Sequence, residues 1–155
     1  MALDDLYREV ILDHYTRPRN KGTLDDADIK VEGANPLCGD ELSISVKLTG
    51  GKISDVRFVG RGCSISQASA SMMTEQLKGK TLPEARGLVG QFKAMMHGQE
   101  VPEEDLGDLM ALQGVRKFPV RIKCATLAWV ALDQGVEEFE GSHHKVEAKA
   151  TSEAE

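Results

Sequence analysis

The chain has few of the residues that mark several classes of protein. Its 155 residues include three Cys, one Trp and five Pro, and aromatic residues make up 5%. The core must therefore be built largely from aliphatic residues and the six Met. No stretch approaches the roughly 20 apolar residues that span a bilayer, so no membrane partner is expected. Residues Met1–Asp5 are acidic and no apolar signal core follows them, which predicts a cytoplasmic protein.

An excess of positive charge is also missing. The formal net charge is −6 at pH 7, which argues against a nucleic-acid partner because such proteins favour a basic face. Cys is sparse and odd in number, and this favours reduced thiols over disulfides in a chain without a signal peptide. The thiols are therefore expected to serve metal binding, catalysis or plain burial.

What is present describes one globular domain. Hydrophobic residues make up 41% of the chain and charged residues 28%, and 155 residues suffice for a single core. We expect this domain to cover residues 1–140. From Gly141 the sequence is polar and poor in bulky apolar residues, so residues 141–155 are predicted to be a disordered tail. The pair His143 and His144 in that tail could bind adventitious metal, and no role is assigned to it.

The first half of the chain reads as a helix followed by strands. Apolar residues from Leu3 to Tyr15 recur every three or four residues, which predicts an amphipathic helix that ends before Pro18. A short strand is expected around Ile29–Val31. Leu42–Leu48 alternates apolar and polar residues, and Ile53–Val59 returns as its partner across the Gly50–Gly51 turn.

The second half reads as helices. Two capping boxes, Ser64 with Gln67 and Thr81 with Glu84, predict two helix starts. An acidic helical piece is expected over Glu103–Leu112, and Pro119 is the expected start of the last helix. Helix, small sheet and then a run of helices predict an α+β domain, with a three-stranded antiparallel sheet covered by helices on one face.

The three cysteines lie where the backbone is expected to turn into or out of a regular element. Their contexts are NPLCGD at 35–40, GRGCS at 60–64 and RIKCA at 121–125. Cys63 precedes a predicted helix, where the helix dipole favours a thiolate, and Cys124 falls in the first turns of the last helix. Cys38 lies on a loop, and in an extended segment it would point to the same side as Asp40.

Three thiols and a carboxylate would make a four-ligand metal site. Thiolates favour Zn²⁺ or an iron–sulfur cluster, provided that three separate elements converge. The alternative is that each Cys only fills space in the core, as free Cys often does. Arg121 and Lys123 could offset the negative charge of such a site or orient an incoming sulfur anion, and otherwise they are ordinary solvated cations.

These motifs resemble a known family. NPLCGD, GRGCSIS with the following ASASM at 68–72, and KCATLAW at 123–129 are similar to the SufU branch of the IscU/NifU N-terminal-domain superfamily, as is the N-terminal segment from Leu6 to Asn20. The resemblance covers roughly residues 3–140. It implies the SufE/NifU-like fold, and it implies metal ligands at Cys38, Asp40, Cys63 and Cys124.

The resemblance also implies a function. Members of the SufU branch bind zinc and accept sulfur from a PLP-dependent cysteine desulfurase of the SufS type, and they supply downstream iron–sulfur assembly machinery. Cys38 would then be the persulfide acceptor, and Arg121 and Lys123 would support it. The chain is therefore expected to be a zinc-dependent sulfurtransferase. The alternatives are a scaffold that binds a [2Fe–2S] cluster on the same ligands and a structural zinc module that only binds partners.

Two departures from the scaffold branch favour sulfur transfer. IscU scaffolds generally place His directly before the third cysteine, where this chain has Lys123. They also carry a Leu-Pro-Pro-Val-Lys stretch, and this chain has only FPVR at 118–121. The segment at about 97–119 looks like the insertion typical of SufU.

Overall fold

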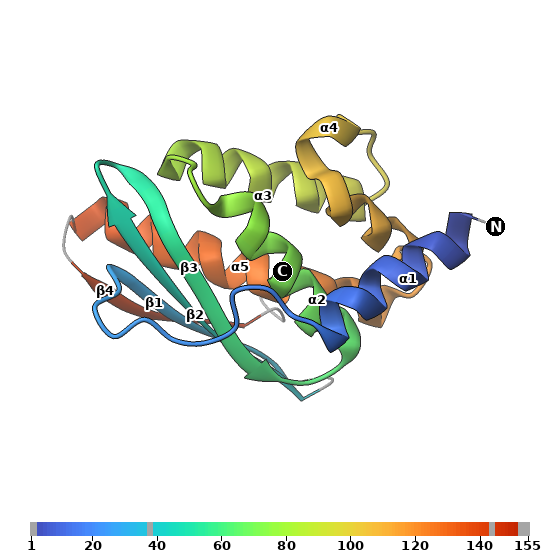
Figure 1. Cartoon of the computed structure of the whole chain (residues 1–155), viewed down its shortest axis with the longest axis horizontal. Coiled ribbons are helices and arrows are strands. Elements are labelled where there is room, and N and C mark those ends of the chain that lie inside the picture. The colour runs from blue at the N-terminus through green and yellow to red at the C-terminus, as the bar shows by residue number, and fades with distance from the viewer. Residues whose placement is uncertain (1–2, 37–38, 143–144, 152–155) are drawn as a thin grey trace.

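Two layers make up the computed structural model, which describes residues 3–36, 39–142 and 145–151 (Figure 1). One layer is a four-stranded sheet with strand order β3-β2-β1-β4, and the other is helical. The strands are β1 (Ile29–Asn35), β2 (Asp40–Thr49), β3 (Lys52–Arg61) and β4 (Val146–Thr151). The helices are α1 (Leu3–Thr16), α2 (Ser64–Leu77), α3 (Leu82–Met96), α4 (Glu103–Leu106), the 3-10 helix η1 (Gly107–Val115) and α5 (Pro119–Ser142).

The sheet combines an antiparallel meander with one parallel strand. β1 pairs with β2 and β2 with β3, both antiparallel, and β4 pairs with β1 in parallel. The β2–β3 turn has positive φ at Gly50 (61°) and Gly51 (80°), which confirms the predicted glycine hairpin. The expected three-stranded antiparallel sheet is corrected to a mixed sheet of four strands.

The additional strand lies in the segment that was expected to be disordered. That prediction is wrong for β4, where Val146, Ala148 and Ala150 alternate with charged residues and Ala148 is buried. The alternation has period two, as in other half-buried strands. Its apolar members are small, so the composition of the tail hid a pattern that pairing with β1 makes stable.

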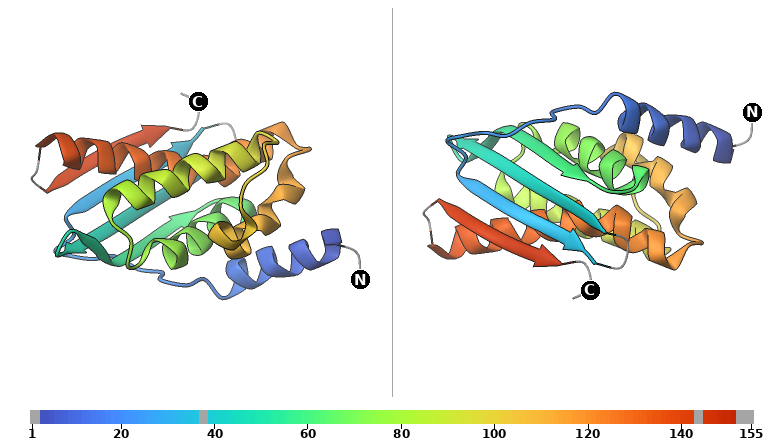
Figure 2. Two further views of the ribbon diagram at one scale, coloured as in Figure 1. Left: turned by 90° about the horizontal axis from the view of Figure 1, so that it is seen from above. Right: turned by 90° about the horizontal axis from the view of Figure 1, so that it is seen from below.

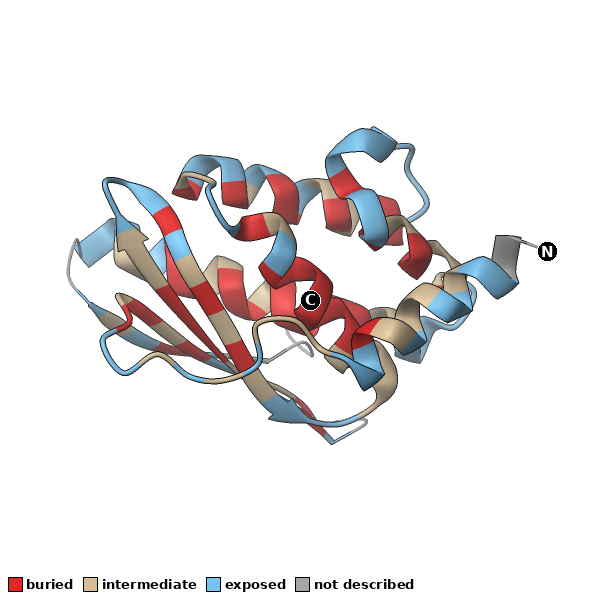
Figure 3. Ribbon diagram, viewed as in Figure 1, coloured by how far each residue is buried: buried red, intermediate tan, exposed pale blue. Residues whose placement is uncertain are grey.

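The helices cover one face of the sheet, as the sequence predicts (Figure 2). α5 packs on β1 and β4, α2 packs on β3, and α1 packs on α2 and η1. α3 packs on α5, where the rings of Phe92 and Trp129 stack with centroids 4.6 Å apart. The buried residues concentrate between these two layers and among the helices (Figure 3). The domain is therefore α+β.

Two glycines let α5 lie close to β1. A Cβ on Gly33 would come within 3.0 Å of the Ala131 Cβ, and one on Gly135 would come within 2.7 Å of Ile29 Cγ2. These distances are shorter than ordinary contacts between carbon atoms. The close approach fixes the position of α5, and with it the position of Cys124 near its start.

Most helix boundaries follow the sequence signals, with two corrections. The capping box of Thr81 and Glu84 is present at the start of α3. The box predicted for Ser64 and Gln67 is wrong, because Cys63 is the N-cap of α2 and its own side chain makes no capping hydrogen bond. The predicted helix over 103–112 is broken at Gly107, whose φ is +52°, and continues as the 3-10 helix η1.

Among the described residues, no helix is long and apolar enough to cross a membrane.

Candidate metal centre

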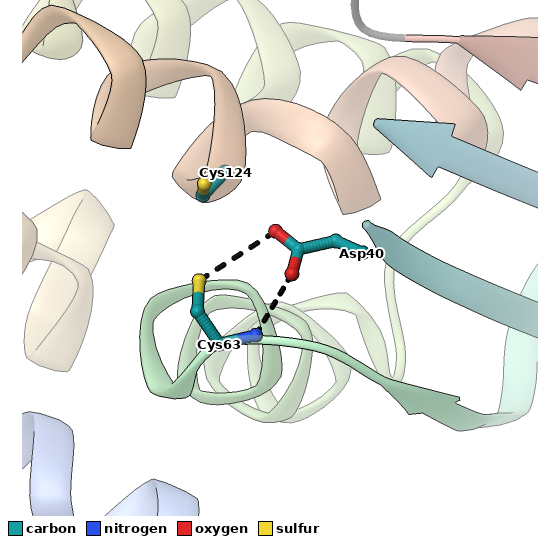
Figure 4. A group of neighbouring side chains, drawn as sticks. All are labelled: Asp40, Cys63 and Cys124. Atoms are coloured by element: carbon teal, nitrogen blue, oxygen red, sulfur yellow. Dashed lines mark hydrogen bonds between the residues drawn. The ribbon is translucent and has the colours of Figure 1, made fainter. Parts of the chain in front are cut away.

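Three elements meet at one end of the sheet and bring together three of the predicted ligands. Asp40 is the first residue of β2, Cys63 is the N-cap of α2, and Cys124 lies in the second turn of α5 (Figure 4). One carboxylate oxygen and the two sulfur atoms lie within 4.8 Å of one another. The predicted convergence of separate elements is therefore observed for these three residues.

The carboxylate of Asp40 is buried and directed at Cys63. Its Oδ1 accepts a hydrogen bond of 2.8 Å from the backbone N–H of Cys63, and its Oδ2 lies 3.5 Å from Cys63 Sγ. The first contact satisfies one of the N–H groups that a helix start leaves unpaired. Asp40 therefore fixes the position of the Cys63 thiol and of the first turn of α2 relative to β2.

Gly62 leaves the space that the Asp40 carboxylate occupies. Its φ is +142°, which side-chain-bearing residues rarely adopt, and a Cβ there would overlap Asp40 Oδ1. No other residue type can bring the chain into α2 along this path without moving the carboxylate. The sequence shows a glycine at this position, but its role becomes visible only in three dimensions.

Cys124 is fully buried among polar partners. The side-chain N–H of Asn35 points at its sulfur from 3.9 Å, and the sulfur lies 3.5 Å from the carbonyl oxygen of Val120 in the preceding turn. Asn35 is itself fully buried at the end of β1. Sequence reasoning passed over Asn35, although it stands at the start of the NPLCGD motif.

Arg121 supplies the positive charge of the site. The pKa of its guanidinium is raised above the usual value, first by the charge of Cys63 and then by a hydrogen bond with Cys124. The side chain is exposed, so it also faces solvent. The guanidinium of Arg121 therefore lies close enough to both thiols for their charges to favour its protonated form.

Lys123 and Cys38 are the two remaining residues that the sequence predicts for the site. With the residues that the structure describes, the ammonium group of Lys123 forms no hydrogen bond or ion pair. Cys38 lies outside the described residues. The chain around it belongs to the β1–β2 connection, because Asn35 pairs with Asp40 and the Gly39 N–H donates to the Asn35 carbonyl oxygen at 2.9 Å.

The donor set fits a thiolate-preferring ion. A tetrahedral Zn²⁺ with bonds of about 2.3 Å to sulfur and 2.1 Å to oxygen places the two ligand atoms about 3.6 Å apart. The Asp40 Oδ2 and Cys63 Sγ atoms are 3.5 Å apart. Two thiols, a carboxylate and a further thiol two residues before Asp40 match the ligand types that zinc takes in proteins.

An open groove adjoins the site. It has a volume of about 390 Å³ and runs between α1, the end of η1 and the starts of α2 and α5. Its walls are largely apolar, with Tyr7, Ile11, Ile65 and Phe118 among them, and Arg121 lines it as well. The cation of Arg121 therefore lies at the wall of this groove as well as near the thiols.

Comparisons with known proteins cover nearly the whole chain. The family model of the NifU-like N-terminal domain matches residues 6–146. The zinc-dependent sulfurtransferase SufU of Bacillus subtilis is 54% identical over 142 residues, which are 91% of this chain and 96% of the relative. The iron–sulfur cluster assembly scaffold protein IscU of Streptococcus pyogenes is 46% identical over 92% of this chain and 89% of its own length.

A solved structure of a similar protein has the same fold as this chain. The crystal structure of a SufU from Fervidobacterium islandicum, described as an iron–sulfur cluster assembly scaffold protein for the SUF system, superimposes with a TM-score of 0.79. It is 38% identical and covers 83% of this chain and 94% of its own. The similar proteins thus agree on fold and family, and they divide between sulfur transfer and scaffolding in their names.

Proposed function

The chain belongs to the family of the NifU-like N-terminal domain, and from that premise we propose that it is a zinc-dependent sulfurtransferase of iron–sulfur cluster assembly. It accepts persulfide sulfur from a SufS-type, PLP-dependent cysteine desulfurase in the cytoplasm and passes it to the downstream assembly machinery. The observation that carries the proposal is the group formed by Asp40, Cys63 and Cys124, with Cys38 two residues before Asp40 in the sequence.

Each residue has a role in this proposal. Asp40, Cys63, Cys124 and Cys38 would hold the zinc ion, which would favour the deprotonated form of the thiols. Cys38 is assigned as the acceptor because its place in the sequence, between the end of β1 and the start of β2, is outside both strands, whereas Cys63 is the N-cap of α2 and Cys124 lies in α5. Arg121 faces the thiols and the groove, so its charge can orient an incoming persulfide anion.

The transfer itself is a thiol–disulfide type exchange. The Cys38 thiolate attacks the outer sulfur of the desulfurase persulfide, and a new sulfur–sulfur bond forms on Cys38. The bond between the two sulfurs of the desulfurase persulfide breaks, and the desulfurase cysteine leaves as a thiolate. One sulfur atom moves and no external oxidant or reductant is needed.

The alternative functions remain distinct. The scaffold hypothesis is favoured by the names of two of the relatives, and it places a [2Fe–2S] cluster on the same ligands. Lys123 stands where scaffolds generally have His, and the SufU relative has the higher identity of the two curated relatives described, so transfer is the better supported proposal. A structural zinc module would hold the metal and take up no sulfur.

The proposal is tested with the desulfurase and two variants. Wild-type protein purified in air should contain one zinc per chain and should stimulate cysteine turnover by the desulfurase. Cys38→Ala should abolish the stimulation, because no acceptor thiol is left for the persulfide. Asp40→Ala should reduce the zinc content, because one of the ligands is removed.

Three outcomes of these experiments would count against the proposal. Near-normal stimulation by Cys38→Ala would remove that residue as acceptor. A stable reconstituted [2Fe–2S] cluster that is handed to an apo-protein, without stimulation of the desulfurase, would favour the scaffold. Unchanged zinc content and full activity in Asp40→Ala would remove Asp40 from the site.

A further inference from the structure

A second group of metal-ligand side chains lies away from the thiols, around His14. This residue lies in the last turn of α1, and its side chain is fully buried. Nε2 lies 3.0 Å from Asp108 Oδ2 on η1 and 3.7 Å from Glu75 Oε1 on α2. One atom each from His14, Glu75 and Asp108 lie within 4.8 Å of one another.

The separations suit a divalent transition metal. Bonds of about 2.0–2.1 Å to nitrogen and oxygen place two ligand atoms about 3.4 Å apart in a tetrahedral site and about 2.9 Å apart in an octahedral one. The two separations from Nε2, 3.0 and 3.7 Å, lie on either side of the tetrahedral value, and the shorter one is close to the octahedral value. The Glu75 and Asp108 side chains are 45% and 58% exposed, so both carboxylates are free to rotate by the small amount required.

The other ring nitrogen of His14 is held in the way that metal-binding histidines are held. Nδ1 lies 2.8 Å from the hydroxyl oxygen of Ser71, and the same oxygen accepts a hydrogen bond from the Arg19 backbone N–H at 2.9 Å. An oxygen with two lone pairs can accept from both N–H groups. Nε2 is at hydrogen-bond distance from Asp108 Oδ2, and a bound ion would take the place of the proton between them. With Nδ1–H donated to Ser71, the Nε2 lone pair would then bind the ion, and such a partner commonly orients a ligand histidine.

The charges around Nε2 also favour a cation. Two carboxylates face one imidazole, and Glu75 also pairs with Arg19, whose Nε is 4.0 Å from Oε1. Arg19 forms a shorter pair of 2.6 Å with Asp13, so it balances Glu75 only in part. A divalent ion at this point would neutralise both carboxylates.

We propose that His14, Glu75 and Asp108 form a second site for a divalent transition metal, which ties α1 to α2 and η1. A bound ion would help to hold α1 in place. Among residues 5–16, for which the structure describes burial, His14 is the one fully buried residue, while Leu6 and Leu12 are each 48% exposed. The apolar contacts of α1 with the core come from Val10 and Ile11, which are only partly buried, and an ion on His14 would add to them in holding the helix that forms one wall of the groove beside the thiols.

The site is tested by titrating Co²⁺ into protein whose thiol site is already filled with zinc. Isothermal calorimetry should show one further Co²⁺ per chain, and its absorption should lack the intense charge-transfer band of cobalt bound to sulfur. The double variant Glu75→Gln with Asp108→Asn keeps the size of both side chains and removes their charge. Its affinity for this ion should fall at least about tenfold, since even outer-shell partners of a metal are worth that much.

Two matched variants separate this site from general charge and from the C-terminal histidines. Glu103→Gln with Glu104→Gln removes the same charge from exposed positions on α4 and should bind Co²⁺ like the wild type. His143→Ala with His144→Ala should also bind normally. No further Co²⁺ in the wild type, an ion retained by the Glu75 and Asp108 variant, or an ion lost with His143 and His144 would each overturn the proposal.

Discussion

At the scale of single residues, the candidate centre depends on a glycine that carries no functional group. Gly62→Ala would place a Cβ against Asp40 Oδ1 on a backbone that L-residues avoid. The carboxylate must move, and its hydrogen bond to the Cys63 N–H must break. We expect the affinity for zinc to fall at least about tenfold, measured by competition with a chromophoric chelator.

A second glycine separates the effect on the site from the strain of a positive φ. Gly50 has a φ of +61° in the β2–β3 turn, and nothing lies within 4 Å of a Cβ built on it. Gly50→Ala should lose stability while its zinc affinity stays at the wild-type value. If Gly62→Ala binds zinc as tightly as Gly50→Ala does, Asp40 is not held by this packing.

Arg121 is the residue expected to receive the sulfur anion. Arg121→Met keeps the length of the side chain and removes the charge that faces Cys63 and Cys124. A hydrogen bond to a charged group contributes roughly 1.5–3 kcal/mol, so persulfide transfer to the protein should slow by about tenfold or more. The rate is measured by quenched-flow sampling of the sulfur bound to the protein.

Lys123→Met is the control for Arg121→Met, since it removes an equal charge two residues away. Lys123 has no described partner at the site, so a smaller effect is expected. Equal slowing in both variants would point to the general positive charge at the start of α5 and not to Arg121 itself.

The residues of the site were predictable to different degrees. The chemistry of thiols and carboxylates, together with the family motifs, pointed to Asp40, Cys63 and Cys124, and the structure brings these three together. Asn35 and Gly62 were not singled out because their roles depend on distance alone. An amide 3.9 Å from a buried sulfur and a missing Cβ leave no periodic signal in a sequence.

At the scale of elements, the N-cap residue of α2, Cys63, is also a candidate metal ligand. Cys63 is the N-cap, and Asp40 reaches across from β2 to accept its backbone N–H. The sequence predicted the helix correctly but assigned its start to a local capping box of Ser64 and Gln67. A tertiary contact from β2 replaces that box, and tertiary contacts are what local capping rules omit.

The fourth strand gives a direct test of the C-terminal region. Ala148 is 7% exposed and faces the helical layer, whereas Lys149 is exposed. Ala148→Asp should lower the free energy of unfolding by about 2–3 kcal/mol, because a charge is placed in an apolar site without a partner. Urea unfolding followed by circular dichroism measures the change.

Lys149→Asp introduces the same side chain one residue away on the opposite face of the strand. Lys149 is paired with Glu32 on β1, so the two like charges should lower the free energy of unfolding by up to about 1 kcal/mol, which is less than the effect of Ala148→Asp. Equal and small effects of Ala148→Asp and Lys149→Asp would mean that the segment after residue 145 does not pair with β1.

At the scale of the whole molecule, the proposed zinc site joins elements that are far apart in the chain. Asp40, Cys63 and Cys124 come from β2, α2 and α5, so a bound ion links the sheet to both helices that cover it. A ligand that binds only the folded state stabilises it by about 4 kcal/mol when its free concentration is a thousand times Kd. Chelation should therefore lower the melting temperature, and added zinc should restore it.

The matched variant for metal removal is Cys63→Ser, which retains the shape of the N-cap. Its melting temperature should be lower than that of the zinc-loaded wild type and should respond little to zinc or chelator. A wild-type melting temperature that is independent of free zinc would show that the three residues do not form a metal site that stabilises the fold.

The layer arrangement was predictable because several independent signals agreed on it. The glycine hairpin, the period-two strands and the capping box of Thr81 all pointed to helices on one face of a small sheet. The strand Val146–Thr151 was not predictable from the chain alone. Its parallel partner β1 lies more than a hundred residues earlier in the sequence, and no short turn connects the two strands.

The central claim is that the protein takes up sulfur on Cys38, and intact mass spectrometry tests it most directly. Zinc-loaded protein is incubated with a SufS-type desulfurase and cysteine, and its mass is compared with that of Cys38→Ser treated in the same way. We predict that the wild type gains one sulfur atom, located on Cys38 by peptide analysis, and that Cys38→Ser gains none. A wild-type protein that gains no sulfur, or one that carries it on Cys63 or Cys124, would rule out Cys38 as the acceptor.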